Sequence, residues 1–198
     1  MRRNSHSLAT NPGGTLVRSN TVSMRRRSVR LAVGAVLASL FMPALVAAAG
    51  QAELSDVRAA TAKFHSVQAA IEAGYELGYV NGSNVRIIAG CVAHPTAGAM
   101  GYHYFNKALI DDLVVDVLKP EGLVYSPGPD GRLRLVAVEY VVPGALSNPP
   151  GVSSAPSVFG REMVILVPAV GFYTLHAWIW SNNPAGIFAH WSPQVSCT

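Results

Sequence analysis

The segment Phe172–Trp180 (FYTLHAWIW) constrains the fold of this 198-residue chain more than any other segment. Side chains alternate between the two faces of a strand. One face of this strand carries only apolar side chains, namely Tyr173, Leu175, Ala177 and Ile179. The other face carries Thr174, His176, Trp178 and Trp180. A strand that is apolar on both faces must be covered on both sides, so we expect a central strand with an enclosed His176.

Five further short segments predict the remaining strands of the sheet. They are rich in β-branched and aromatic residues, are bounded by turn residues, and cover residues 84–89, 100–105, 123–125, 133–142 and 163–167. The sequence Pro127–Gly131 (PGPDG) predicts a hairpin turn between two of them. Residues 91–99 and 143–160 are rich in small residues and proline, and they predict loops.

One longer helix is predicted before the strands. Ser55 or Asp56 can cap its start, and Gly74 ends it near Tyr75. Apolar residues recur at steps of three and four, namely Val57, Ala60, Phe64, Val67, Ile71 and Tyr75. The elements together predict an α+β fold, with one N-terminal helix packed on a mostly antiparallel sheet of five or six short strands. A small β-barrel with an added helix is the alternative.

Residues 1–49 have the organisation of an export presequence. Arg25–Arg30 is a basic segment, Leu31–Val46 is apolar, and Ala47–Ala49 is a small-residue cleavage signal. The paired arginines fit a twin-arginine signal as well as an ordinary secretory signal, and an uncleaved anchor is a further alternative. Residues 1–23 have the character of an unstructured leader, and Met24 is an alternative start of the chain. We expect an exported protein, periplasmic or extracellular, whose residues 50–198 form a single soluble domain without a membrane span.

The charged residues are distributed differently before and after the end of the presequence at residue 49. Seven of the 15 lysines and arginines precede Gly50, and no aspartate or glutamate does. The other eight basic residues accompany all 11 acidic ones, which leaves the region after the boundary with a net charge of −3. The basic pI of the whole chain therefore belongs to the presequence, and a nucleic-acid partner is excluded because no basic surface remains.

The two cysteines, Cys91 and Cys197, are expected to form one disulfide, because export delivers the chain to an oxidising compartment. The bond would hold the C-terminal end against the loop at Cys91. The alternative is a metal site that combines the thiols with His94, and it requires both cysteines to stay reduced. With the disulfide formed, His94 and His190 lie in neighbouring segments, where they are either a second, exposed metal site or ordinary surface histidines.

Three polar residues fall on predicted strands in otherwise apolar surroundings: His103, Glu139 and His176. A carboxylate buried without a partner is costly, so Glu139 should have a partner or line a cavity. Two histidines and one glutamate are a ligand set for a divalent transition metal such as Zn, Cu or Fe. The same groups could instead form a metal-free polar pocket for acid–base work, or each could bind a local partner and have no further role.

These residues lead to three hypotheses about function. The first is an exported domain with a metal- or small-ligand-binding pocket built from His103, Glu139 and His176. The second is an enzyme, a metal-dependent hydrolase or oxidase, that uses the same residues. The third is a structural or interaction domain without a site. The chain has no G-x-S-x-G motif and no P-loop, so a nucleophile-elbow hydrolase and a P-loop nucleotide site are unsupported.

Several segments together resemble a group of uncharacterised exported bacterial proteins. They are the GYHYFNxALIDD-type segment within Ala99–Asp112, LVAVEY at Leu135–Tyr140, LHAWIWxxNPAGIFA at Leu175–Ala189, and Val195–Cys197. The resemblance covers most of the chain after the presequence, and it implies export and one compact domain. It implies no activity. Its segments contain His103, Glu139 and His176.

Overall fold

The computed structural model of the chain describes residues 53–197, and the predicted presequence lies outside the described residues. The helical elements are a helix over residues 53–61, η1 (Ala62–His65), α2 (Val67–Glu72) and α3 (Lys107–Asp111). The strands are β1 (Tyr75–Leu77), β2 (Tyr79–Val80), β3 (Arg86–Ile87), β4 (Cys91–His94), β5 (Gly98–Asn106), β6 (Gly122–Pro127), β7 (Leu133–Pro143), β8 (Ser157–Val158), β9 (Arg161–Glu162), β10 (Val164–Ile165) and β11 (Phe172–Ala177).

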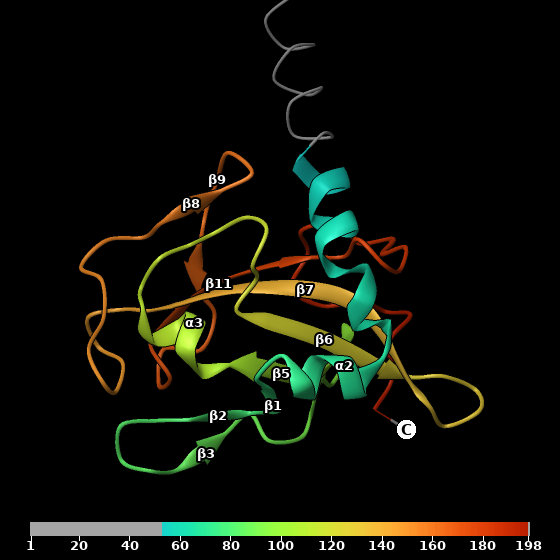
Figure 1. Cartoon of the computed structure of the whole chain (residues 1–198), viewed down its shortest axis with the longest axis horizontal. Helices are drawn as coiled ribbons and strands as arrows, with labels where there is room; N and C mark the ends of the chain where they lie inside the picture. Colours follow the sequence, from blue (N-terminus) through green and yellow to red (C-terminus); the bar gives the residue numbers. More distant parts are fainter. Residues whose placement is uncertain (1–52, 198) are drawn as a thin grey trace, which may run out of the picture. The chain divides into compact units, whose positions relative to one another are not determined.

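A seven-stranded antiparallel sheet organises the described region. Its strand order is β1-β5-β6-β7-β11-β10, and β4 pairs with β5 beside this path. Two separate ribbons, β2-β3 and β8-β9, complete the strands (Figure 1). The predicted α+β fold is confirmed, with more strands than expected. The barrel alternative is wrong, because the sheet is open and its path ends at β1 and β10.

The predicted continuous helix is interrupted. Ser66 has an extended backbone, with φ −86° and ψ 115°, and its hydroxyl accepts a hydrogen bond from the Ala69 N–H, so it ends one helical segment and caps the next. The break changes the helical phase. Val57 and Phe64 are buried as predicted, whereas Ile71 is 47% exposed. Tyr75 is not helical and begins β1.

Two strand boundaries also differ from the prediction. Cys91–His94, predicted as loop, is strand β4, because its backbone pairs with Gly98–Tyr102 of β5. The strand predicted over Phe172–Trp180 ends at Ala177, because the Trp178 N–H turns away to donate to the Ile187 carbonyl oxygen. The hairpin at Pro127–Gly131 is confirmed, and it joins β6 to β7.

Both faces of the sheet are packed. One face buries the helical segments through Leu54, Val57 and Phe64, which cluster with Val138 and Leu175 of the sheet. Smaller apolar clusters cover the opposite face, and they include Phe105, Val141, Phe172 and Trp178. Strand β11, apolar on both sides, therefore lies inside the sheet between β7 and β10 as predicted.

Cys91 and Cys197 form the predicted disulfide, which ties the C-terminal segment to β4. The alternative metal site with His94 is excluded, because neither thiol is free. Among residues 53–197, no helix is both long enough and apolar enough to cross a lipid bilayer.

Candidate metal centre

His103, Glu139 and His176 converge on the face of the sheet opposite the helical segments of residues 53–72, the face on which Ile110 of α3 also packs. Glu139 of β7 stands directly across from His176 of β11 and, on its other side, from Gly122 of β6. His103 is on β5, beyond β6, and its side chain reaches over that strand toward the carboxylate. The three residues are only 2%, 4% and 1% exposed, respectively. We call them the triad.

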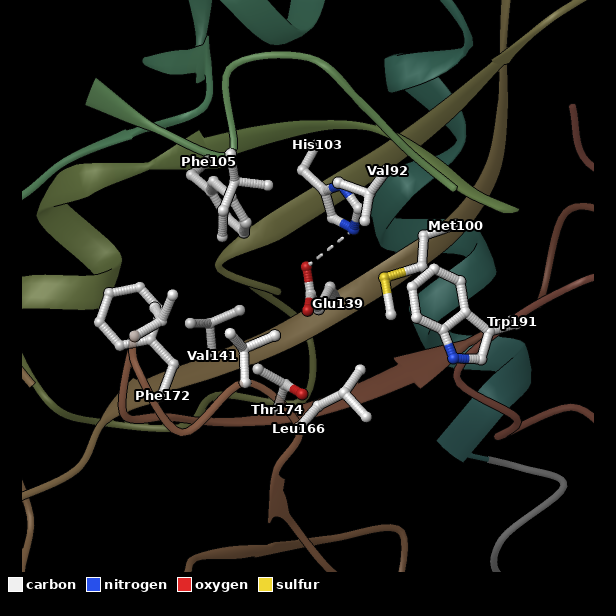
Figure 2. A pocket seen from close by; sticks show the side chains of 13 residues that line it. Val92, Met100, His103, Phe105, Glu139, Val141, Leu166, Phe172, Thr174 and Trp191 are labelled. Atoms are coloured by element: carbon white, nitrogen blue, oxygen red, sulfur yellow. Dashed lines mark ion pairs between the residues drawn. The ribbon is translucent and has the colours of Figure 1, made fainter. Parts of the chain in front are cut away.

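The nitrogen and oxygen atoms of the triad lie close together. His103 Nε2 is 3.3 Å from His176 Nε2 and 3.5 Å from Glu139 Oε2. His176 Nε2 is 3.6 Å from Glu139 Oε1. Each histidine thus faces a different oxygen of the same carboxylate, and Figure 2 shows the contact of His103 with Glu139. One ligand atom from each residue lies within 4.8 Å of the other two, so the group is compact.

Gly122 makes room for this arrangement. A Cβ at position 122 would lie 3.1 Å from the Glu139 Cβ and 3.1 Å from Phe105 Cε1. Both distances are tighter than ordinary van der Waals contact. The missing side chain therefore lets Glu139 and the ring of Phe105 meet across β6.

A β-bulge in β7 decides which residues share a face with Glu139. Val124 pairs with Ala137, but the next residue of β6, Tyr125, pairs with Leu135, so Val136 is an extra residue. As a result Leu135 packs with the helical face, whereas Ala137 and Val141 remain on the side of Glu139. Simple alternation along Leu133–Val141 would place Leu135 on the same face as Glu139, and the bulge moves it to the other face.

Burial disfavours the charged form of every triad member. It lowers the pKa of His103 to about 4, against a small opposing effect of the Gly101 backbone. It also lowers the pKa of His176 well below its usual value, and the neighbouring His103 and His190 lower it further. Burial raises the pKa of Glu139 to about 8, and Glu121 adds to that shift. Near pH 7 both histidines are therefore neutral and offer a lone pair, which is the form that binds metals, whereas Glu139 has to release a proton when an ion binds.

The triad has few hydrogen bonds of its own. Glu139 Oε2 and the Nδ1 atoms of His103 and His176 are buried without a hydrogen-bond partner among the described residues. Buried polar groups without partners are costly, and a cation bound through the Nε2 atoms and Glu139 would offset that cost at the carboxylate oxygen but not at the Nδ1 atoms. Among residues 53–197, the triad is the one group of three or more potential ligands close enough to share an ion.

The spacing of the triad atoms can be compared with metal geometry. Zinc is bound in a tetrahedron by nitrogen and oxygen at about 2.0–2.1 Å, which places neighbouring ligand atoms about 3.3–3.4 Å apart. Octahedral coordination at the same bond length would place them about 2.9 Å apart. The 3.3 Å between the two histidine nitrogens matches the tetrahedral value, whereas the two nitrogen–oxygen separations of 3.5 and 3.6 Å, which involve different oxygens of Glu139, are longer. Three protein ligands would leave the fourth position open.

His65 and His94 lie apart from the triad, whereas His190 is close enough to His176 to lower its pKa. His94 is exposed, and its Nδ1 accepts hydrogen bonds from the N–H groups of Thr96 and Ala97. His65 is also exposed, and its ring lies edge-on to Trp180. The second metal site considered at His94 and His190 does not form a three-ligand cluster in the described part of the chain.

Sequence reasoning missed two polar residues of this region. Glu121 is buried, accepts a hydrogen bond from the Val141 N–H, and has a pKa raised to about 8 by burial. It precedes the predicted strand at 123–125, so strand alternation gave no signal for it. Thr174 was placed on the face of His176 by strand alternation but was not assigned to the site, where its Oγ1 is buried without a hydrogen-bond partner among the described residues.

Comparison with known protein families, with curated proteins and with solved structures finds no match to this chain. The resemblance to exported bacterial proteins therefore stays a prediction, and the case for function depends on the geometry of the triad.

Proposed function

We propose that this protein binds one divalent transition metal ion through His103, Glu139 and His176, and that Zn²⁺ fits the site best. The observation that carries the proposal is the buried cluster of donor atoms, in which the two histidine nitrogens lie 3.3 Å apart and each lies 3.5–3.6 Å from one oxygen of Glu139. Neutral histidines and a carboxylate are suitable ligands for Zn²⁺, and the spacing is close to that of a tetrahedral ion. The ion would join β5, β7 and β11, which carry His103, Glu139 and His176.

We also propose that the protein works outside the cytoplasm. The presequence predicted at residues 1–49 and the disulfide between Cys91 and Cys197 support this location, since structural disulfides persist in oxidising compartments. N-terminal sequencing of protein recovered from the exported fraction of bacterial cells tests the location. A chain that keeps residues 1–49 and stays in the cytoplasm contradicts it.

The metal proposal is tested on the full chain, produced with its presequence and purified with a tag that contains no histidine. Elemental analysis should find one metal ion per chain. Replacement by Co²⁺ should give the intense visible absorption of a tetrahedral site. Loss of a residue that only supports a metal ligand weakens metal binding by roughly 10- to 100-fold. Glu139→Gln should weaken it by more than that, because a direct ligand loses its charge.

A matched control is available within the same protein. Glu121 is another buried carboxylate with a pKa raised to about 8, but it lies outside the triad. Glu121→Gln and the exposed His94→Gln should both keep one ion per chain. Substoichiometric metal in the unaltered protein, or equal losses in Glu121→Gln and Glu139→Gln, contradicts the proposal.

A further inference from the structure

A cavity of about 150 Å³ adjoins the triad. Figure 2 shows Glu139 near its centre, with Phe105 and Phe172 to one side and Met100 and Trp191 to the other. Apart from His103, Glu139 and Thr174, its wall is formed almost entirely by aliphatic and aromatic side chains. Apolar cavities of about this volume hold one benzene ring, so the space fits a molecule with a body of that size.

The cavity lies on one side of the proposed ion. His103 and Glu139 contribute to its wall, whereas His176 does not. A tetrahedral ion bound by the three residues has one coordination position left for a water molecule or a ligand. Because His103 and Glu139 line the cavity, an ion held by the three residues would be reachable from it. A molecule in the cavity can therefore reach the ion directly with one donor atom.

Charge restricts what this molecule can be. A divalent ion with one carboxylate ligand has a net charge of +1, and a charge in apolar surroundings is costly. A donor group with a single negative charge would neutralise it. The hydroxyl of Thr174 is buried and has no hydrogen-bond partner among the described residues, so it can donate to a second oxygen of that group.

We propose that the cavity binds a small monoanionic carboxylate whose apolar body is about one six-membered ring. This inference rests on the metal site proposed above. One carboxylate oxygen completes the coordination of the ion, and the other accepts a hydrogen bond from Thr174. The ring lies among Phe105, Val141 and Phe172.

Benzoate and acetate are suitable probes, because they share the donor group and differ in the ring. Each is titrated into the Co²⁺-loaded full chain and followed by the visible spectrum of the metal. Both should shift the spectrum, and benzoate should bind roughly 10- to 100-fold more tightly, because burial of an aromatic ring contributes that much. Equal affinities for benzoate and acetate would overturn the inference.

A variant that fills the cavity provides a second test. Val170 contributes to the cavity wall, so Val170→Trp should keep the Co²⁺ absorption and abolish the preference for benzoate. Val164→Trp is the matched control, since Val164 is 43% exposed and is not part of the wall. Full benzoate preference in Val170→Trp contradicts the inference. A chain that binds no metal contradicts the metal proposal and this inference together, whereas bound metal without ring preference overturns only the cavity ligand.

Discussion

Single residues on the strands around Glu139 set the chemistry of the site. Glu121 and Glu139 are both buried, and burial raises the pKa of each to about 8. Their surroundings differ, since Glu121 accepts a backbone hydrogen bond and Glu139 faces two histidines. The same burial therefore gives one carboxylate a structural role and leaves the other available to a cation.

Glu121 should make the metal-free protein less stable as the pH rises. Its usual pKa is 4.5, and in the folded chain it is about 8, so the folded state holds a proton that the unfolded state has already lost. The free energy of unfolding therefore falls between about pH 4.5 and pH 8. Glu121→Gln keeps an oxygen for the Val141 N–H and should remove this part of the fall, on the order of 1–3 kcal/mol.

Urea unfolding at pH 5 and pH 8.5, with and without Glu121→Gln, measures the effect. The exposed Glu162→Gln is the control and should leave the pH dependence unchanged. Glu139 has the same raised pKa and is present in both proteins. The free energy of unfolding of the variant should therefore still fall with pH, but less steeply than that of the wild type. If the free energy of unfolding fell equally with pH in the wild type and in Glu121→Gln, the raised pKa of Glu121 would be contradicted.

Gly122→Ala should disturb the site without changing any ligand. The added Cβ would contact the Glu139 Cβ and the Phe105 ring at 3.1 Å, and both are tightly buried. We expect a loss of about 1–3 kcal/mol of stability, as for other overpacked positions, together with weaker metal binding. Thermal unfolding and Co²⁺ titration measure the two effects. Gly90→Ala, with no atom within 4 Å of the added Cβ, should change neither.

At the scale of elements, patterns that depend on neighbouring residues were predictable and patterns that depend on distant partners were not. The hairpin at Pro127–Gly131 and the strand centred on His103 follow from turn chemistry and alternation. Strand β4 could not be found, because its four residues are held by pairing with β5 and by the disulfide. The bulge at Val136 was also invisible, since it depends on the register with β6.

The disulfide should be the main restraint on β4 and the C-terminal segment. It joins residues 106 positions apart, and closing a loop of that length restricts the unfolded chain by up to about 4–5 kcal/mol. Replacing both Cys91 and Cys197 with serine should lower the free energy of unfolding by about 2–5 kcal/mol. Urea unfolding of the two proteins measures it. A reducing agent should destabilise the wild type and leave the double variant unaffected; equal responses would contradict this role.

At the scale of the whole molecule, the proposed ion connects strands that are far apart in sequence. It would bind β5, β7 and β11, and no other group of three potential ligands in residues 53–197 can do so. A ligand that binds only the folded state stabilises it, by about 2.7 kcal/mol when its free concentration is 100 times its Kd. The ion should therefore stabilise the folded sheet by linking three of its strands.

Metal removal should lower the melting temperature of the wild type. At that Zn²⁺ concentration we expect a difference of roughly 5–10 °C between loaded and chelator-treated protein, given the size of the domain. Differential scanning calorimetry measures it. The melting temperature of Glu139→Gln should depend little on Zn²⁺, whereas that of Glu121→Gln should depend on Zn²⁺ as strongly as the wild type does. A chelator that leaves the melting temperature of the loaded wild type unchanged would contradict a structural contribution of the ion.

The amino-acid sequence by itself determined the fold class, the partners of the disulfide and the three residues of the triad. It could do so because strand alternation, turn residues and cysteine number are local or countable properties. Only the tertiary structure decided that one ligand atom from each triad residue lies within 4.8 Å of the others. That closeness requires the register of β7 with β11, the absence of a side chain at Gly122, and the reach of His103 across β6. The cavity beside Glu139 was likewise set by packing between segments distant in sequence, which no local pattern encodes.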